Sequence, residues 1–331
     1  MADLDLCTPV LSAMDLAEES NLYVAYPLLV LAPPPGPDRS SYKLFTLPDQ
    51  KLQDVTPLVS SKKKVWLATP QGWVLVLSSS DSPSATTGTY LLNTMDGSRI
   101  ELPALKDDEA SGACRCVLSN PVAAPGCGVL VFDLASPVVW FCRVGQDLRW
   151  LKRNFFDVAA VDGRFFFCES ESSDSLGTLD FHTGGASEEP EVRLGAIAVP
   201  SIEAPMGITA TYVVESCNHL FLVHIAFHGV CVDRPGELHV YRMDFSDPPA
   251  WRKTDCIGDR VFLLGDSNFA ASCSASGCGL KPNCVYWVNC FSEENSDLHV
   301  LGLRDGSSEI VKRFENVLGV HKPFWVVPVD A

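Results

Sequence analysis

The feature that most constrains the fold of this chain is a recurring pattern of short apolar runs separated by turn residues. From Leu22 onward, runs of five to eight apolar residues are divided by Gly, Asp, Asn, Pro or Ser, and few windows have the apolar spacing of a helix. The run Trp-Val-Leu-Val-Leu at residues 73–77 is typical, because it places apolar side chains on both faces of a strand. Such a strand must be buried on both sides, whereas a sheet with one face in water alternates apolar and polar residues. The pattern therefore predicts an all-β chain with packed sheets.

One unit recurs along the chain: strand, loop, strand, tight turn, strand. The most complete stretch covers residues 251–291, in which two apolar runs are bounded by turns. Five such units begin at turns, which lie at Gly72, Gly128, Gly163, Asn218 and Asn283. The steps between these turns are 56, 35, 55 and 65 residues by subtraction. These steps average to about one four-stranded blade with its loops. With a further unit in residues 22–55, the chain is predicted to form a single β-propeller of about six four-stranded blades, with seven as the alternative count.

The two ends of the chain have separate expectations. Residues 1–21 form a short acidic lead that we expect to be loosely held, and residues 22–331 form the propeller domain. Residues 324–327 read as a strand without a unit of its own, so we expect it to complete the blade begun near residues 28–31 or 42–47. Deletion of residues 322–331 would then expose a sheet edge. Two tryptophans at the ends of units, Trp150 and Trp251, are expected to wedge between blades.

Charge and cysteine content narrow the functional classes. The formal charge of −16 argues against nucleic-acid binding, and the basic run Lys62-Lys63-Lys64 is interpreted as a solvated loop. The thirteen cysteines are expected to be thiols, because the count is odd and the first residues have no secretory signal pattern. The most apolar stretches, residues 22–31 and 221–232, are too short or too interrupted to span a bilayer. We therefore expect a soluble monomer of the cytoplasm or nucleus, without membrane association.

Histidine and cysteine spacings do not predict a metal site. On one strand His224 and His228 share a face but lie about 13 Å apart, and His219 faces the other way. Cys273, Cys278, Cys284 and Cys290 lack the Cys-x-x-Cys spacing of a zinc knuckle, and Cys114 and Cys116 share a strand face without further ligands. No metal ligand is therefore predicted.

Motifs of catalysis and cofactor binding were also sought. The glycines at 126–128 and 277–279 have no Gly-Lys-Ser/Thr behind them, and the sequence holds no nucleophile elbow or dinucleotide fingerprint. No catalytic residue and no cofactor are predicted. The acidic clusters at residues 107–109, 188–191 and 293–294 are interpreted as solvated loop tips, with a rim that attracts a basic peptide as the alternative.

Several blocks of the sequence resemble a known family. They are residues 72–75, 91–93 with 100–103, 213–216, and above all Asp-Arg-Val-Phe-Leu-Leu-Gly-Asp at 259–266 followed by Gly-Leu-Lys-Pro-Asn-Cys-Val-Tyr-Trp at 279–287. These blocks resemble the plant KIB-type β-propeller family, also called domain of unknown function 295, over roughly residues 22–315. The last block is the most specific.

The resemblance implies a propeller that often follows an F-box and recognises substrates for a ubiquitin ligase, or that binds and inhibits a shaggy-type kinase. Residues 1–21 have neither the length of an F-box nor its Leu-Pro dipeptide. We therefore expect a non-catalytic protein-recognition propeller in plant signalling or protein turnover that binds a partner protein. The alternatives are a ligase subunit with the F-box on another chain, and a kinase-inhibiting regulator. The sequence does not predict which residues bind the partner.

Overall fold

The computed structural model describes most of the chain in segments. They are residues 26–31, 42–55, 64–78, 88–105, 114–122, 124, 126–133, 138–154, 156–161, 163–168, 175–180, 191–200, 209–227, 232, 234–246, 248–265, 269–289, 295–315 and 323–328. The predicted acidic lead at residues 1–21 lies outside these residues, so its boundary with the propeller stays a prediction. In the described residues no helix has the length and apolar character that crossing a membrane would require.

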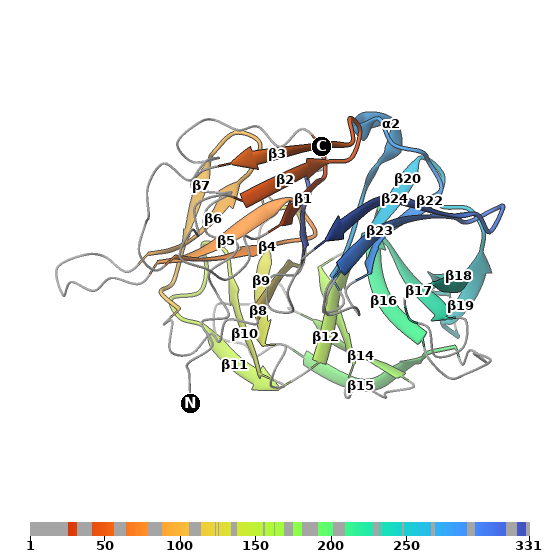
Figure 1. Ribbon diagram of the computed structural model, residues 1–331. Coiled ribbons are helices and arrows are strands. Elements are labelled where there is room, and N and C mark those ends of the chain that lie inside the picture. The colour runs from red at the N-terminus through yellow and green to blue at the C-terminus, as the bar shows by residue number, and fades with distance from the viewer. Residues whose placement is uncertain are drawn as a thin grey trace, which may run out of the picture. The chain divides into compact units, whose positions relative to one another are not determined.

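The chain divides into two compact units, and the first contains three four-stranded sheets (Figure 1). In the order of their hydrogen bonding these are β25-β1-β2-β3, β4-β5-β6-β7 and β11-β10-β9-β8. The strands are β1 Leu28–Leu31, β2 Tyr42–Thr46, β3 Lys51–Val55, β4 Lys64–Ala68, β5 Trp73–Ser78, β6 Thr89–Asn93, β7 Arg99–Leu102, β8 Cys114–Leu118, β9 Gly128–Asp133, β10 Val138–Arg143, β11 Leu151–Asn154 and β25 Phe324–Val326.

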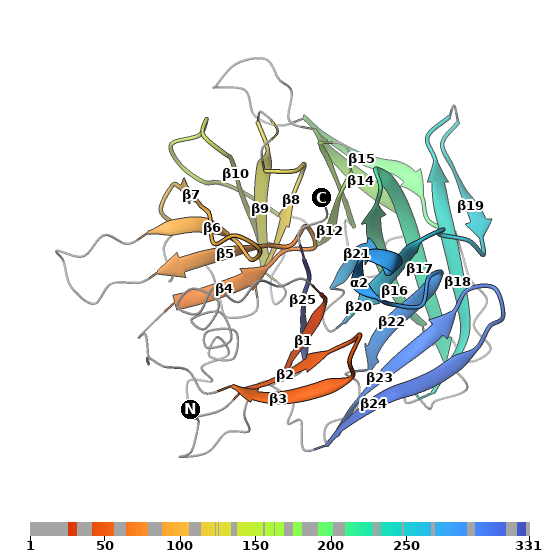
Figure 2. The same ribbon diagram turned by 90° about the horizontal axis from the view of Figure 1, so that it is seen from above.

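The first sheet joins the two ends of the described chain. Strand β25 lies next to β1, so the strand expected to complete the N-terminal blade is found in that place (Figure 2). Trp325 in β25 is 1% exposed and Leu29 in β1 is fully buried, which shows that both strands are covered. Because β25 hydrogen-bonds to one edge of β1 and β2 to the other, β1 has no open edge at which another strand could pair.

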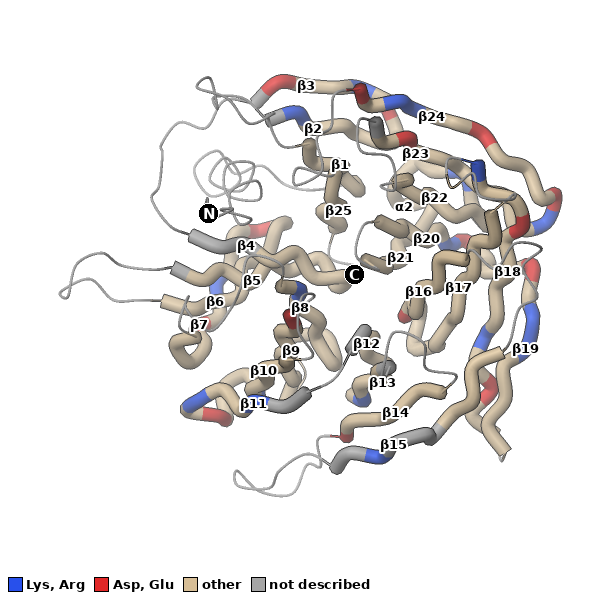
Figure 3. The backbone as a smooth tube through the Cα atoms, turned by 60° about the horizontal axis from the view of Figure 1, so that its bottom comes forward, with Lys and Arg blue, Asp and Glu red and all other residues tan. Residues whose placement is uncertain are grey.

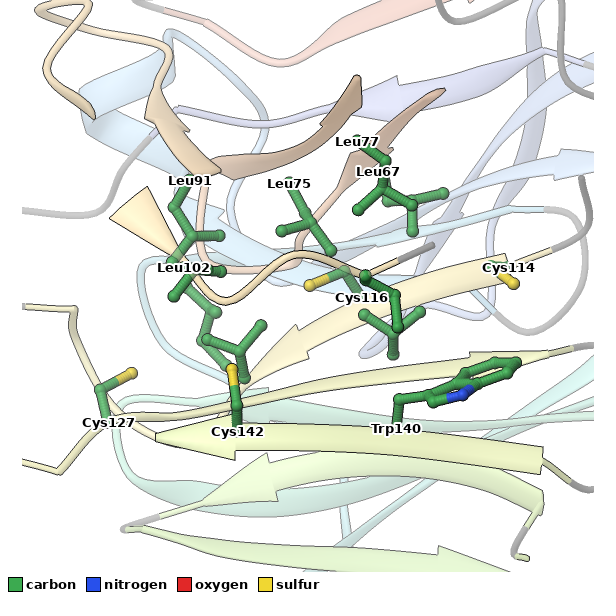
Figure 4. Close-up of a cluster of buried hydrophobic side chains, with 14 of the residues drawn as sticks. Leu67, Leu75, Leu77, Leu91, Leu102, Cys114, Cys116, Cys127, Trp140 and Cys142 are labelled. Carbon is green, nitrogen blue, oxygen red and sulfur yellow. The ribbon is translucent and has the colours of Figure 1, made fainter. Parts of the chain in front are cut away.

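The apolar runs of the first unit are buried on both faces, as predicted. Leu75 and Leu91 on neighbouring strands of one sheet pack into a cluster with Cys116 and Cys142 of the next (Figure 4). The adjacent residues Val74 and Val76, which point to the opposite face of β5, are also fully buried. This two-sided burial is the physical reason why the strands lack alternating polar residues.

A tryptophan connects the second and third sheets of this unit. Trp150 is half-buried against the cluster just described, and its Nε1 donates to the carbonyl oxygen of Pro103 at 2.7 Å. Pro103 directly follows β7, while Trp150 directly precedes β11. This side chain therefore lies between two blades, as the sequence predicted.

The second unit contains three further sheets. Their hydrogen-bonding orders are β12-β13-β14-β15, β16-β17-β18-β19 and β21-β20-β22-β23-β24. The elements are β12 Phe156–Val161, β13 Arg164–Cys168, β14 Ser175–Asp180, β15 Glu191–Ala198, β16 Thr209–Ser216, β17 His219–Phe227, β18 Pro235–Asp244, β19 Ala250–Thr254, β20 Arg260–Leu264, β21 Ala270–Ser274, α2 Ala275–Cys278, β22 Cys284–Asn289, β23 Asn295–Gly302 and β24 Ser308–Glu315.

The sheet β20–β24 departs from the four-stranded pattern. Strand β20 pairs in parallel with β22 and antiparallel with β21, so the chain adds a strand between the edge strand and β22. The short helix α2 connects β21 to β22. The extra strand is apolar, with Val261, Phe262, Leu263 and Leu264 all fully buried, and it packs against the preceding sheet through the Phe221 and Phe262 rings, 5.2 Å apart.

Four of the turns that the sequence analysis singled out have a left-handed backbone. Gly72, Gly163, Asn218 and Asn283 have φ values of 82°, 79°, 60° and 59°. Each lies just before a strand that enters the middle of its sheet. Glycine and asparagine tolerate this region of φ, which explains their recurrence at these places.

The six sheets confirm an all-β propeller of six blades, five of four strands and one of five. The predicted start of the units was wrong by one strand, because β5, β9, β13 and β17 are each the second strand of their sheet. The first strands were not included in the predicted units, because polar residues interrupt their apolar runs, such as Arg115 in β8. Trp251 packs in a cluster with Met243 and residues of the sheet β12–β15, as expected for a side chain between blades.

Candidate functional site

The candidate site is the region around α2, which we call the α2 corner and define as residues 255–260 and 274–283. It contains Asp259, Arg260 and residues 279–283 of the sequence block that carries the family resemblance. It also presents exposed polar side chains on short, hydrogen-bonded turns. We therefore examined what each of these side chains contacts.

Asp259 holds the start of α2. Its carboxylate accepts hydrogen bonds from the hydroxyl groups of Ser274 and Ser276 and from the backbone N–H of Ser276 at 3.1 Å. Ser274 is the N-cap of the helix, since its Oγ accepts from the backbone N–H of Gly277 at 3.0 Å. The hydroxyl of Ser276 is the main reason why the pKa of Asp259 is lowered. A carboxylate with a lowered pKa is a weak base, so this group is suited to closing the turn rather than to removing a proton from serine.

Asn283 joins the chain entering the corner to the chain leaving it. Its side-chain oxygen accepts from the backbone N–H of Ile257 at 2.7 Å, and its Nδ2 donates to the carbonyl oxygen of Asp255 at 2.9 Å. Its own backbone N–H donates to the carbonyl oxygen of Arg260. Asn283 therefore combines a left-handed turn with two cross-links that glycine could not make.

Arg260 connects the corner to the sheet β16–β19. Its Nε donates to the hydroxyl groups of Ser216 at 3.2 Å and Ser272 at 3.0 Å, and the two hydroxyl oxygens lie 2.8 Å apart. Ser216 and Ser272 are 3% and 9% exposed. Buried hydroxyl groups need hydrogen-bond partners, so this arrangement stabilises the contact between the two sheets.

Trp287, the last residue of the family block, belongs to the core below the corner. Its Nε1 donates to the hydroxyl of Tyr212 at 3.0 Å, and its ring lies 5.6 Å from that of Phe227 and 5.2 Å from that of His299. Trp287 is fully buried. The most specific residues of the sequence block therefore fix the packing of two sheets.

Cys256 is the exposed nucleophile of the corner. The backbone N–H of Gly258 and then the guanidinium of Arg304, whose Nη2 is 3.3 Å from the sulfur, lower the pKa of this thiol. Thr254 fixes the loop by exchanging hydrogen bonds with the backbone of Cys256. Sequence analysis did not single out Cys256, because the cation that acts on it is 48 residues away in the chain.

The histidines considered in the sequence lie apart. His219 Nδ1 contacts the carbonyl oxygen of Cys217 at 2.7 Å, and the centroid of its ring lies 6.4 Å from that of Phe221, with the two rings tilted by 54°. His224 lies on the opposite face of β17, with Nδ1 2.8 Å from the hydroxyl of Thr211. His228 lies outside the described residues.

The residue beside His224 is one that sequence spacing did not identify. His239 of β18 lies directly opposite His224, and it contacts Glu237 at 3.1 Å and Lys253 at 3.1 Å. Burial, and secondarily the charge of His239, lowers the pKa of His224 to about 4. Only strand register could have placed these two rings together.

The cysteines gather in two places. Cys114, Cys116, Cys127 and Cys142 lie in the core cluster of the first unit (Figure 4), where burial above all raises the pKa of the Cys116 thiol. The second set includes Cys273 on β21, Cys278 on α2 and Cys284 on β22, while Cys290 lies outside the described residues. In the part of the chain that the structure describes, no three His, Cys, Asp or Glu side chains are placed to hold one metal ion.

The remaining charged segments do not belong to the α2 corner. The acidic clusters at residues 107–109, 188–190 and 293–294 and the run from Lys62 to Lys63 lie outside the described residues. Glu191 and Lys64 are the first residues of the strands β15 and β4 rather than loop residues, and their side chains are not described. For the other residues of these segments, the interpretation as solvated loops stays a prediction.

Comparison with known proteins extends these observations. Among solved structures, TolB from Acinetobacter baumannii matches with a TM-score of 0.45 and 13% identity over 96% of this chain and 71% of that chain. A protein from Lactobacillus plantarum matches with a TM-score of 0.37 and 11% identity over 91% and 98% of the two chains. A putative 6-phosphogluconolactonase from Bacteroides uniformis matches with a TM-score of 0.38 and 9% identity over 88% and 83%. At these values the three proteins are no guide to the function of this chain.

The sequence match is more informative. No curated protein matches the chain. The model of the KIB1-4 β-propeller family matches residues 44–312, which include four complete sheets of the propeller and the α2 corner. The chain therefore belongs to the KIB1-4 β-propeller family.

Proposed function

We propose that this protein is a non-catalytic recognition module that binds a partner protein in the cytoplasm or nucleus. The observation that carries the proposal is the use of the polar groups at the α2 corner. Asp259, Asn283 and Arg260 each make hydrogen bonds that hold turns or sheets together. Groups committed to such bonds are not arranged around a place for a reacting atom.

A second observation supports binding through the turns. Leu148, between β10 and β11, is 96% exposed. Its turn is rigid, because the carboxylate of Asp147 accepts from the backbone N–H of Arg143 at 2.7 Å and from its guanidinium at 2.9 Å. The side chains of this ion pair are only 8% and 10% exposed. A leucine side chain held in water on such a turn would lose exposed apolar surface on contact with a partner protein, which favours binding.

The test is a partner list from proximity labelling in plant tissue, followed by direct binding of recombinant proteins. We expect a saturable complex with at least one labelled protein that is weakened by Leu148→Asp. Leu52→Asp is the matched control, because Leu52 is also exposed, at 41%, but lies on an edge strand rather than on this turn. If neither labelling nor direct binding yields a saturable complex, the proposal is wrong.

The same experiment separates the two more specific roles that the family suggests. Co-purification of a Skp-type adaptor would favour the ligase subunit with its F-box on another chain. Recovery of a shaggy-type kinase whose activity falls when the purified protein is added would favour the kinase regulator. A partner of neither class would leave recognition as the function and remove both specific roles.

A further inference from the structure

Two arginines lie directly opposite each other on the sheet β16–β19. Arg242 of β18 pairs in register with Arg252 of β19, and both are exposed. In the second unit, Figure 3 marks charged positions on both of these strands but none on β17 or β22. The Cβ atoms of directly opposite residues are about 4.5–5.5 Å apart. These two residues, which we call the arginine pair, therefore project their side chains from neighbouring positions on one face of the sheet.

The charge of the arginine pair is only partly balanced. Asp244 lies on the same face of β18, and its Oδ2 is 3.5 Å from Nε of Arg252. Arg242 makes no ion pair with any other residue that the structure describes. The neighbouring Lys253 does not belong to the pair, because its Nζ lies 3.1 Å from Nδ1 of His239 on the other face. Among the described residues, one positive charge at this place is thus without a carboxylate counter-charge.

In two other sheets of the same unit, an exposed arginine lies opposite a carboxylate. Arg313 of β24 lies opposite Asp297 of β23, and its Nη2 is 2.8 Å from Oδ2 of that carboxylate. Arg164 of β13 lies opposite Asp180 of β14, with Nε 3.0 Å from Oδ1. Like charges directly opposite are destabilising, whereas opposite charges attract. The arginine pair is therefore unfavourable in the isolated chain unless an anion from outside neutralises it.

We propose that the arginine pair binds a phosphorylated serine or threonine of a partner peptide. This inference rests on the proposed function and deepens it, because it names the chemistry of the partner. A phosphate monoester carries a charge of about −1.5 to −2 at neutral pH, which matches two guanidinium groups better than one carboxylate does. Arginine also presents paired N–H donors that fit phosphate oxygens. A long nucleic acid is a poorer match, because the chain as a whole carries −16.

The test uses a fluorescent peptide with one central phosphoserine, its unphosphorylated form, and a short single-stranded DNA of similar length. Binding to the full chain is followed by fluorescence anisotropy at low and high salt. We expect saturable binding of the phosphopeptide that weakens with salt. Arg242→Gln and Arg252→Gln should each weaken it by about tenfold, the loss expected for a charge-assisted hydrogen bond. Inorganic phosphate should compete with the peptide only at much higher concentration, because it lacks the peptide contacts.

Arg313→Gln is the matched control, because it removes the same charge from an arginine that already has a carboxylate opposite it. It should leave phosphopeptide binding unchanged. The melting temperature of the free protein gives a second readout: Arg242→Gln should keep or raise it, whereas Arg313→Gln should lower it.

Three results would overturn the inference. The first is phosphopeptide binding that survives in the double variant Arg242→Gln/Arg252→Gln or is absent from the native chain. The second is equal loss in Arg313→Gln. The third is DNA bound as tightly as the phosphopeptide and lost in the same variants, which would assign the site to nucleic acid. A partner found by proximity labelling without a phosphate requirement would leave the recognition function standing while removing this inference.

Discussion

The neighbouring sheets β16–β19 and β20–β24 differ in strand order and in which polar side chains lie opposite one another. The first keeps a regular four-stranded order, and it places His224 against a second histidine and Arg242 against a second arginine. The second inserts a strand, and it places Arg313 opposite a carboxylate. The irregular sheet thus places an exposed arginine opposite a carboxylate, whereas the regular sheet places two arginines opposite each other. The difference suggests that the family block stabilises the fold, while the regular sheet carries the uncompensated charge that a partner could use.

The largest expected effect tests whether the sheet β20–β24 contributes more to the free energy of unfolding than the sheet β16–β19. Trp287→Ala removes a fully buried ring that contacts Phe227 and His299 and leaves the hydroxyl of Tyr212 without its donor. We expect a loss of about 3–5 kcal/mol in the free energy of unfolding, measured by denaturant titration. Trp251→Ala in the regular sheet, where the ring is half-buried, should cost only about 1–2 kcal/mol. Equal losses would contradict the ranking of the two sheets.

A second prediction concerns His224 and acid. Burial lowers the pKa of His224 to about 4 in the folded chain from an ordinary value of about 6.5, so the unfolded chain binds more protons between these values. Stability from this residue is therefore complete above pH 6.5 and falls as the pH drops towards 4, by up to about 3 kcal/mol. His224→Gln keeps a partner for Thr211 but does not titrate.

The measurement for this prediction is the difference in unfolding free energy between the native chain and His224→Gln from pH 7 to pH 4. We expect the native chain to lose its advantage over the variant in this range. A difference that stays constant with pH would show that the ring is not held neutral by burial.

A third prediction compares two turns with the same backbone. Asn218 and Asn283 have φ values of 60° and 59°, but of the two only the Asn283 side chain makes hydrogen bonds to other described residues, Ile257 and Asp255. Asn283→Gly should cost about 1–2 kcal/mol, because two hydrogen bonds are lost while the left-handed φ remains easy. Asn218→Gly should change the free energy of unfolding by only a few tenths of a kcal/mol. Thermal denaturation of both variants measures the contrast, and similar losses would mean that backbone conformation alone decides these turns.

The smallest expected effect on the stability of the unbound protein concerns the arginine pair itself. Arg252→Gln removes the like-charge contact but also the contact with Asp244 at 3.5 Å. Because exposed ion pairs contribute about 0–1 kcal/mol, the gain from removing the like charge and the loss of the contact with Asp244 should nearly cancel. The melting temperature should stay close to that of the native chain at low salt. A clear fall would show that Asp244 rather than an external anion is the main partner of Arg252.

Much of the architecture could be predicted from local patterns. Strands such as residues 73–77 are apolar at every position, so burial on both faces followed directly, and Gly72 and Asn283 marked left-handed turns. Strands with mixed composition were missed, including the first strands of four sheets. The parallel pairing of β20 with β22 was also beyond prediction, because nothing in residues 260–264 distinguishes a parallel from an antiparallel neighbour.

The sequence by itself determined that this chain is built from two-sided apolar strands and left-handed turns, because those depend on the side chains and φ preferences of adjacent residues. Only the tertiary structure decided which polar groups meet. Arg242 lies opposite Arg252, His224 opposite His239, and Arg304 beside Cys256, over separations that range from 10 to 48 residues. Strand register sets the first two of these contacts, and a shift of one residue would reverse the face of every side chain on the strand, whereas Arg304 and Cys256 meet through two turns.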